Sequence, residues 1–309
     1  MALVPLKQLA RYLQRELGDI YSSGEIVALS RLLFHELREG LPAMVVTGKC
    51  NHLSTTYSRA ASFLMKEEDE VSFWDTAKVT AVVEVIRRLK TGEPVQYIVG
   101  RTEFHGLMLH VTPDVLIPRP ETEELVEWVL DELPSGKLKL LDVGTGSGCI
   151  AVALGKRRPD IEVYACDSSG KAIAVAQRNA RENEVDVNFF VWDILVPLSV
   201  SFLDNGSFHA VVSNPPYVLE SERAVMEANV LDFEPPEALF VPDRSSLLFY
   251  ERIADLSLSL LGEGGYLFFE VNQSKGDEVR TMLFEKGYRN VKLRSDMAAN
   301  PRMVRAIKP

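Results

Sequence analysis

A glycine-rich segment, Asp142-Val143-Gly144-Thr145-Gly146-Ser147-Gly148, combines residue types suited to holding a ligand. It follows an apolar run typical of a strand and precedes an expected helix. Glycine lets the backbone approach a ligand without interference from a Cβ atom, and the start of the helix offers unpaired N–H groups. We therefore expect ligand contacts from Gly144, Thr145, Gly146, Ser147 and Gly148.

The spacing of these glycines indicates the kind of ligand. The order is G-x-G-x-G, whereas dinucleotide loops read G-x-G-x-x-G, so no second glycine step is available for a pyrophosphate. Asp167 ends the next expected strand, where a carboxylate can accept hydrogen bonds from both hydroxyls of a ribose. An adenosine compound without a pyrophosphate fits this pattern, and S-adenosylmethionine is one. Two alternatives stay open, a tight turn without a ligand and a NAD-type ligand.

Residues at the tips of two neighbouring strands are expected to complete this pocket. Asp142 lies near the tip of the first strand, where it can orient the glycine loop or receive the ammonium group of the ligand. Trp192-Asp193-Ile194 follow the third strand and should line the adenine end. Asp193 can accept from the adenine amino group and Ile194 can give apolar contact, whereas Trp192 fits the core equally well.

A second motif, Ser213-Asn214-Pro215-Pro216-Tyr217, follows the apolar residues 210–212. The side-chain oxygen of Asn214 and the carbonyl of Pro215 can both accept from one planar NH₂ group. Such a nitrogen is a poor nucleophile, so holding it in line with a methyl group is much of the catalysis. Pro215 and Pro216 limit the freedom of the loop, and Tyr217 can lay its ring against a planar substrate group. No general base is required before transfer, because the proton becomes acidic once the nitrogen is alkylated. A purely structural proline-rich turn is the alternative.

The elements that must position both motifs alternate between strand and helix from Lys137 onward. This pattern predicts a parallel sheet covered on both faces, with ligands at the carboxyl ends of its strands. The expected strands are 138–143, 162–166, 187–191, 210–213 and 265–271, with a closing pair at 290–294 and 303–308. The expected helices are 149–158, 171–183, 246–261 and 274–286, after one that starts near Glu121 or Thr122.

The first ninety residues differ in pattern from the rest. Leu6, Leu9, Leu13 and Leu17 begin a series of helical spacings that predicts a bundle of four or five short helices. Residues 41–56 show no clear periodicity, and the acidic run 67–70 is expected to be a solvated turn or helix start. Residues 94–117 alternate in hydropathy and predict a short β-hairpin or extended connector. The two prolines within 117–122 predict a stiff, extended segment. The expected domains are 1–92, a connector 93–117, and 118–309.

Composition narrows the class of protein. Hydrophobic residues make up 46% of the 309 residues and charged residues 25%, the balance of a globular protein. The net charge is −10, and because residues 1–100 are balanced, the whole deficit lies beyond them. An acidic body attracts phosphate backbones poorly. The sequence has three cysteines without zinc-ligand spacing, so we expect a reducing compartment and no metal site. It shows neither a signal peptide nor a long apolar run, so we expect a cytoplasmic protein without a membrane span.

With both motifs placed, the chain resembles the release factor glutamine methyltransferases over nearly its whole length. The glycine loop, Asp167 and Asn214-Pro215-Pro216-Tyr217 are shared with several amino-group methyltransferases. The more specific segments are Gly92-Glu93-Pro94-Val95-Gln96-Tyr97-Ile98 with Gly100, Glu103-Phe104, Ile117-Pro118-Arg119-Pro120-Glu121-Thr122-Glu123, and Phe233-Glu234-Pro235 with Ala238-Leu239. In one place the sequence departs from the family, because Trp192 stands where a glycine is common.

The resemblance implies a Rossmann-like class I methyltransferase sheet, joined by a β-hairpin connector to a small helical domain that grips the protein substrate. It implies methyl transfer from S-adenosylmethionine, leaving S-adenosylhomocysteine, to the side-chain N5 of the glutamine in the Gly-Gly-Gln tip of peptide chain release factors. It also places Arg119, Glu121 and Thr122 close to the active site and suggests that Phe104 walls the glutamine pocket. No direct nucleic-acid or membrane partner is implied.

Two other functions stay open from the sequence. The same Asn-Pro-Pro-Tyr loop would serve an enzyme that methylates an adenine N6 or guanine N2 amino group on a flipped base. The acidic charge and the lack of a separate basic recognition domain disfavour it. A non-catalytic adapter that binds a translation factor is the other, but neither motif looks degraded.

Overall fold

The computed structural model describes residues 3–40, 54–65, 73–196 and 207–309. Its chain divides into two compact units, one formed by Met1–Gly100 with Ala228–Phe233 and the other by Arg101–Glu227 with Glu234–Pro309. The acidic run 67–70 and most of the segment 41–56 lie outside the described residues. We describe each unit by itself.

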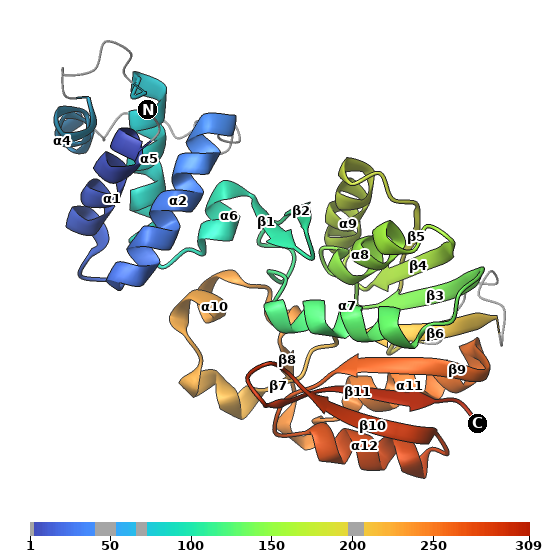
Figure 1. The fold of residues 1–309 in the computed structure, drawn as a ribbon. Coiled ribbons are helices and arrows are strands. Elements are labelled where there is room, and N and C mark those ends of the chain that lie inside the picture. The colour runs from blue at the N-terminus through green and yellow to red at the C-terminus, as the bar shows by residue number, and fades with distance from the viewer. Residues whose placement is uncertain (1–2, 41–53, 66–72, 197–206) are drawn as a thin grey trace. The chain divides into compact units, whose positions relative to one another are not determined.

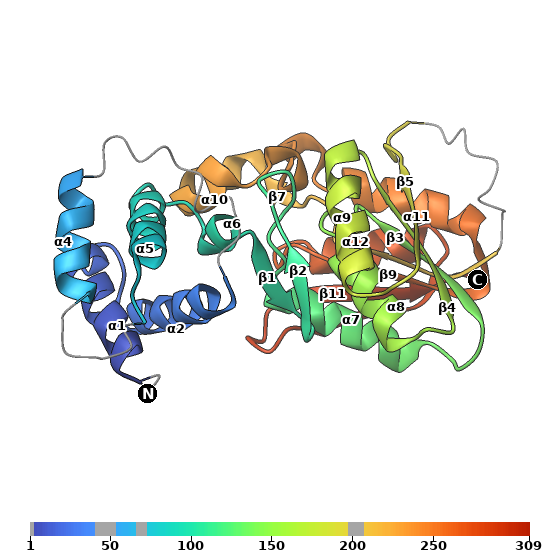
Figure 2. The same ribbon diagram turned by 90° about the horizontal axis from the view of Figure 1, so that it is seen from above.

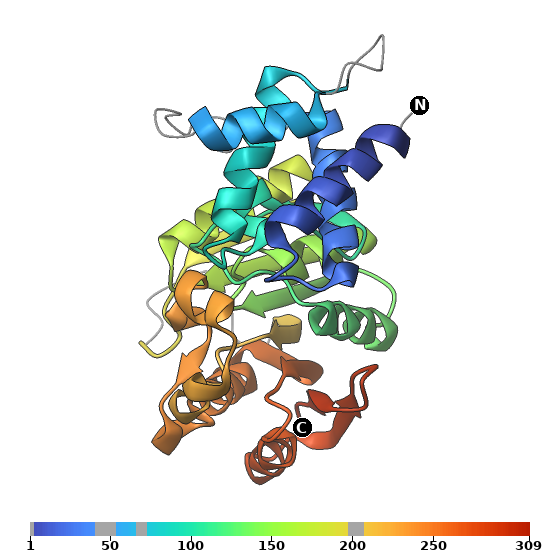
Figure 3. The ribbon, with the colours of Figure 1, turned by 90° about the vertical axis from the view of Figure 1, so that its left-hand side faces the viewer.

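The first unit is helical, as the leucine spacing predicts, and Figure 3 draws the helices of its N-terminal part in blue to cyan. Its core is built from leucines of the first helices, including Leu9, Leu13 and Leu17, together with Trp74. The side chain and backbone of Ser22 and Glu25 bond reciprocally at the start of the second helix, and Asp75 caps another. The helices are α1 (Leu3–Leu17), α2 (Ser23–Glu39), α4 (Ser54–Leu64), α5 (Thr76–Leu89), α6 (Val95–Val99) and α10 (Ala228–Phe233).

The alternating residues at the start of 94–117 are helical, so the prediction of extended structure there is wrong for Val95–Val99. Pro94 precedes this short helix, and its carbonyl accepts from the N–H groups of Tyr97 and Ile98. Gly100 ends it in the left-handed region at φ 74°. The five residues are too few for hydropathy alone to separate a strand from a buried helical turn.

The second half of that segment forms the expected hairpin, in which β1 (Arg101–Phe104) pairs antiparallel with β2 (Leu107–His110). The turn residues His105 and Gly106 both have positive φ, the geometry of a tight two-residue hairpin loop.

A seven-stranded sheet forms the second unit, in the order β10-β11-β9-β6-β3-β4-β5 (Figure 1). Five of its strands, β3, β4, β5, β6 and β9, are parallel, and β11 joins both β9 and β10 antiparallel. This is the Rossmann-like arrangement that the alternation of strands and helices predicts. The strands are β3 (Leu138–Val143), β4 (Ile161–Asp167), β5 (Val187–Val191), β6 (Phe208–Ser213), β9 (Leu261–Glu270), β10 (Arg289–Ser295) and β11 (Pro301–Ile307).

Helices cover both faces of this sheet (Figure 2). The core of one face joins the sheet to three helices, α7, α8 and α9. The opposite core joins it to α11 and α12. Their bounds are α7 (Pro120–Glu132), α8 (Cys149–Arg157), α9 (Gly170–Glu182), α11 (Leu248–Leu260) and α12 (Gly276–Glu285).

The proline segment is less irregular than predicted, because α7 begins at Pro120. Proline is tolerated at the first helical position, where its missing N–H would have no partner within the helix. Arg119 is the N-cap residue in extended conformation.

Short elements occupy the segment between β6 and α11. They include a parallel pair of two-residue strands, β7 (Val218–Leu219) and β8 (Phe240–Val241). Three turns of 3₁₀ helix accompany them, η1 (Glu220–Val225), η2 (Pro236–Ala238) and η3 (Asp243–Ser245).

Candidate active site

The glycine loop is fixed to the carboxyl end of the neighbouring strand β4. The backbone N–H groups of Gly144 and Thr145 both donate to the carbonyl of Cys166, at 2.9 Å each. The N–H of Gly146 donates to the Asp167 carboxylate at 2.9 Å. The order of the sheet reverses between β3 and β6, and ligands bind at such a point in open α/β sheets.

The three glycines of the loop serve different purposes. Gly144, Gly146 and Gly148 have φ of 73°, 52° and 81°, which side chains rarely adopt. A Cβ on Gly148 would lie 2.9 Å from that of Ala176, so this glycine allows α8 and α9 to pack closely. A Cβ on Gly144 or Gly146 would meet no protein atom within 4 Å. Both border the pocket, so these two leave space for a ligand.

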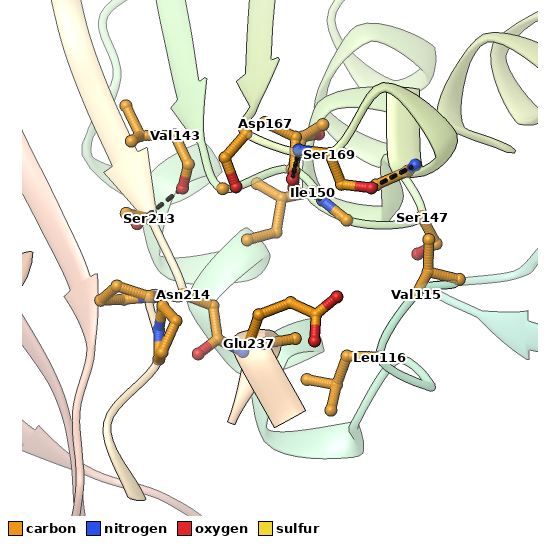
Figure 4. A pocket seen from close by; sticks show the side chains of 18 of the residues that line it. Val115, Leu116, Val143, Ser147, Ile150, Asp167, Ser169, Ser213, Asn214 and Glu237 are labelled. Atoms are coloured by element: carbon orange, nitrogen blue, oxygen red, sulfur yellow. Dashed lines mark hydrogen bonds between the residues drawn. The ribbon is translucent and has the colours of Figure 1, made fainter. Parts of the chain in front are cut away.

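Asp167 lies where the sequence places it, at the end of β4 and on the wall of the pocket (Figure 4). One carboxylate oxygen accepts from Gly146 and the other from the N–H of Ser169 at 2.9 Å. Each oxygen has a further lone pair, so the group can still accept from a ligand. Burial raises the pKa of Asp167, while the N–H groups of Ser169 and Gly146 oppose that shift.

Asp142 is fully buried beneath the loop. It accepts from the Thr145 hydroxyl at 2.6 Å, a contact that orients the loop from below. Its other oxygen, Oδ1, has no hydrogen-bond partner among the described residues. Burial raises the pKa of Asp142 to about 7. The contact fits the predicted orienting role, and the role as an ammonium acceptor stays a prediction.

The far end of the pocket carries the residues predicted for adenine. Trp192, Asp193 and Ile194 all border it, joined by Phe249 and Ile253 from α11. One carboxylate oxygen of Asp193 accepts from the N–H of Leu195 at 2.9 Å. Trp192 also belongs to the core beneath α11, and its contact with adenine stays a prediction.

Asn214 follows β6 directly and borders the same pocket. Its Nδ2 donates to the Thr122 hydroxyl at 3.2 Å. The preceding Ser213 donates from its hydroxyl to the carbonyl of Val143 at 2.6 Å, which joins the ends of β6 and β3 (Figure 4). The glycine loop and the Asn-Pro-Pro-Tyr loop are thus brought together as the sheet topology predicts.

Tyr217 is fixed at both ends. Its hydroxyl donates to Glu270 at 3.1 Å, and its carbonyl accepts from Asn272 at 3.2 Å. Burial raises the pKa of Tyr217, and the nearby Glu270 carboxylate adds to the shift. Tyr217 is not among the residues that border the pocket, so its contact with a planar substrate group stays a prediction.

The remaining predicted substrate residues fall into two groups. Arg119 and Thr122 border the pocket. Arg119 donates to the buried carboxylate of Glu234 at 2.6 Å, and Glu234 also accepts from the N–H of Ile117 at 3.3 Å. Phe104 lies in the core, and neither it nor Glu121 borders the pocket. The substrate contacts of these residues stay predictions.

Two carboxylates that the sequence analysis did not single out belong to this region. Glu237 borders the pocket, and Figure 4 shows its carboxylate pointing into it. Glu270 ends β9 and is 1% exposed. Glu270 could have been found from the sequence, because it is a charged residue at the carboxyl end of a strand next to β6, and ligands bind at the carboxyl ends of the strands in such sheets. No comparable signal exists for Glu237, which reaches the pocket from the short 3₁₀ helix η2.

The pocket fits a nucleoside-type methyl donor. One pocket is bordered by the open space beside Gly144 and Gly146, the Asp167 carboxylate and the apolar side chains near Trp192, which are groups suited to an adenosine compound.

Comparisons agree with this class. Residues 122–232 match the family model described as methyltransferase small domain. A crystal structure of a methyltransferase from Pyrococcus furiosus shares the fold, with a TM-score of 0.50 and 15% sequence identity over 72% of this chain and 96% of that one. Fold and site together define an S-adenosylmethionine-dependent methyltransferase.

Relatives of higher identity specify the family. A release factor glutamine methyltransferase of Bacteroides thetaiotaomicron is 40% identical over 302 residues, which is 97% of this chain and 99% of the relative. A second, from Flavobacterium psychrophilum, is 47% identical over 225 residues, 72% of this chain and 78% of the relative. The chain belongs to the release factor glutamine methyltransferase family. None of the helices within the described ranges is both long and apolar enough to cross a membrane.

Proposed function

We propose that this protein methylates the side-chain N5 of the glutamine in the Gly-Gly-Gln motif of peptide chain release factors. The observation that carries the proposal is the contact of Asn214, which borders the pocket and whose Nδ2 donates to Thr122, so that Oδ1 is available as an acceptor. A glutamine side chain offers the planar NH₂ group that such an acceptor requires. The names of the relatives supply the protein substrate.

The residues of the chain act by holding two groups in line. S-adenosylmethionine, when bound, supplies a methyl group on a positively charged sulfur. The glycine loop and Asp167 would hold its nucleoside, while Asn214 Oδ1 and the Pro215 carbonyl accept from the two N–H bonds of the substrate amide. These contacts fix the amide nitrogen and restrict its rotation. The entropic cost of aligning the nitrogen with the methyl group is therefore met on binding and not in the transfer step.

No side chain is assigned as a general base. The amide nitrogen loses its proton after the new bond forms, when that proton has become acidic. Asn214 and Pro215 offer only acceptors toward the amide, so they favour the developing positive charge on nitrogen. We further propose that the helical unit contributes to gripping the release factor and that the reaction takes place in the cytoplasm.

The test uses labelled S-adenosylmethionine with a purified release factor, beside the same factor carrying glutamine-to-alanine in its Gly-Gly-Gln motif. Ribosomal RNA and DNA are supplied in parallel reactions. Label on the unaltered factor alone supports the proposal. Label on nucleic acid instead would assign the site to base methylation, and label on both factors would place the methyl group on another residue.

A further inference from the structure

We propose that Glu270 is a positioning residue for methyl transfer, acting through Thr122 to fix which end of the Asn214 side-chain amide faces the substrate. The inference rests on the proposed function, because it explains how the acceptor for the substrate amide is kept in its working orientation.

A continuous chain of hydrogen bonds links the three residues. The Thr122 hydroxyl donates to Glu270 Oε2 at 2.6 Å, and Asn214 Nδ2 donates to Thr122 Oγ1 at 3.2 Å. The Tyr217 hydroxyl donates to the other oxygen of Glu270 at 3.1 Å. Glu270 and Thr122 are 1% and 2% exposed, so water does not compete for these contacts.

The direction of these bonds follows from the number of hydrogens available. An ionised carboxylate only accepts, so both hydroxyls must donate to Glu270. The single hydroxyl hydrogen of Thr122 is therefore engaged, and Thr122 offers only a lone pair to Asn214. The Asn214 amide must then turn its NH₂ end toward Thr122 and its oxygen toward the pocket. The opposite orientation would set a donor against the NH₂ group of the substrate.

The fold explains how three distant residues come to meet. Strands β6 and β9 run parallel, and Ser213 pairs with Phe269. The next residues on each side, Asn214 and Glu270, therefore lie next to each other. Thr122, in the first turn of α7, lies between them. Glu270 does not border the pocket, whereas Thr122 and Asn214 do, so Glu270 acts only through other residues.

The surroundings of Glu270 contain compensating charges. Burial raises the pKa of Glu270, whereas the hydrogen bonds from Thr122 and Tyr217 and the positive charge of Arg302 lower it. Glu121 lies on α7 and raises it. Arg302 is itself paired with Asp296 at 3.1 Å. The contacts with Thr122 and Tyr217 and the charge of Arg302 oppose the effect of burial, and so they favour the ionised form on which the orientation depends.

The test uses variants of Thr122, the residue that links Glu270 to Asn214. Thr122→Val keeps the shape of the side chain but removes the hydroxyl, and it should lower kcat by about 10- to 100-fold through misorientation of Asn214. Thr122→Ser restores the hydroxyl and should recover kcat toward that of the wild type. Calorimetry should show unchanged affinity for S-adenosylmethionine in both, and this binding also reports that the variants fold.

Glu270→Gln, alone and with Thr122→Val, separates positioning from a structural role. The glutamine NH₂ can reverse the bond to Thr122, so kcat should fall, but the double variant should be no slower than Thr122→Val because the link is already broken. Losses that multiply, or a Thr122→Val variant with wild-type kcat, would overturn the inference. If Glu270→Gln fails to fold, the Thr122 pair alone decides. Absence of label on the glutamine with the wild-type enzyme would instead overturn the proposed function, and the inference with it.

Discussion

Two polar side chains at the ends of different strands border this pocket. Asp167, at the end of β4, accepts from the N–H of Gly146 in the glycine loop, while Asn214, after β6, donates to Thr122. Because the two residues lie on different strands, the proposed function predicts that binding of the methyl donor and orientation of the amide can be perturbed independently.

Asn214→Ala should lower kcat by about 100-fold or more while leaving the affinity for S-adenosylmethionine unchanged, because it removes the acceptor that orients the amide nitrogen. Steady-state transfer to the release factor and calorimetry measure the two quantities. Asn188→Ala, on the outermost strand β5, is the matched control. Turnover of Asn214→Ala near the wild-type rate would show that the orientation argument is wrong.

Asp167→Ala should weaken binding of S-adenosylmethionine by about 1.5–3 kcal/mol, the range for hydrogen bonds to charged groups. Part of the loss comes from release of Gly146 and Ser169, whose N–H groups Asp167 holds. Asp160→Ala, directly before the same strand, is the control. Equal calorimetric affinity for Asp167→Ala and the control would remove Asp167 from the site.

Asp142 gives a pH dependence of stability. Its pKa is raised from 3.8 to about 7 in the folded protein, so between those values the folded chain holds a proton that the unfolded chain has lost. The free energy of unfolding should therefore fall as pH rises through this window, by about 1.4 kcal/mol for each unit of pKa shift. Asp142→Asn keeps the acceptor for Thr145 but cannot ionise. Denaturant unfolding of both proteins from pH 4 to pH 7 should show the stability difference moving in favour of Asp142→Asn; parallel curves would contradict the account.

At the scale of elements, the sequence best predicts the strands and loops whose position depends on hydropathy or on glycine spacing. Strands 138–143 and 187–191 have the predicted limits because both are apolar runs within a parallel sheet. Helix α7 begins at Pro120, next to the predicted start near Glu121. Val95–Val99 is helical, against expectation, because the carbonyl of Pro94 caps this turn and hydropathy does not decide it. The link from Asn214 to Glu270 depends on side-chain hydrogen bonds between β6, α7 and β9, which no local pattern records.

The glycine loop allows a test that compares positions of similar backbone strain. Gly146→Ala and Gly264→Ala both place a Cβ at positive φ in open space, so each should cost about 1–2 kcal/mol of stability. Only the Gly146 Cβ enters the pocket, so only that variant should lose affinity for S-adenosylmethionine. Gly148→Ala should lose more stability than either, because its Cβ would clash with Ala176.

Thermal unfolding and calorimetry on the three glycine variants measure these effects. Wild-type affinity in Gly146→Ala would show that the space beside the loop is not occupied by the ligand. Equal stability of Gly148→Ala and Gly264→Ala would show that close packing of α8 on α9 is not what requires glycine there.

At the scale of the whole molecule, the chain leaves and re-enters its second unit. The sequence predicts a helical N-terminal domain and an α/β domain, and both are present. It does not predict that Ala228–Phe233, far along the chain, belongs with Met1–Gly100. A Cβ on Gly92 would lie 3.9 Å from the Phe233 ring, a tertiary contact between segments with no shared pattern. The predicted domain limits and the partner-binding role of the helical unit stay predictions.

The most direct measurement is fragmentation mass spectrometry of a release factor after reaction with S-adenosylmethionine and the full-length protein, with Asn214→Ala in parallel. The account predicts one added methyl group on the side chain of the Gly-Gly-Gln glutamine with the wild-type protein and little or none with the variant. A methyl group on another residue, or an unmodified glutamine with the wild-type protein, would contradict it.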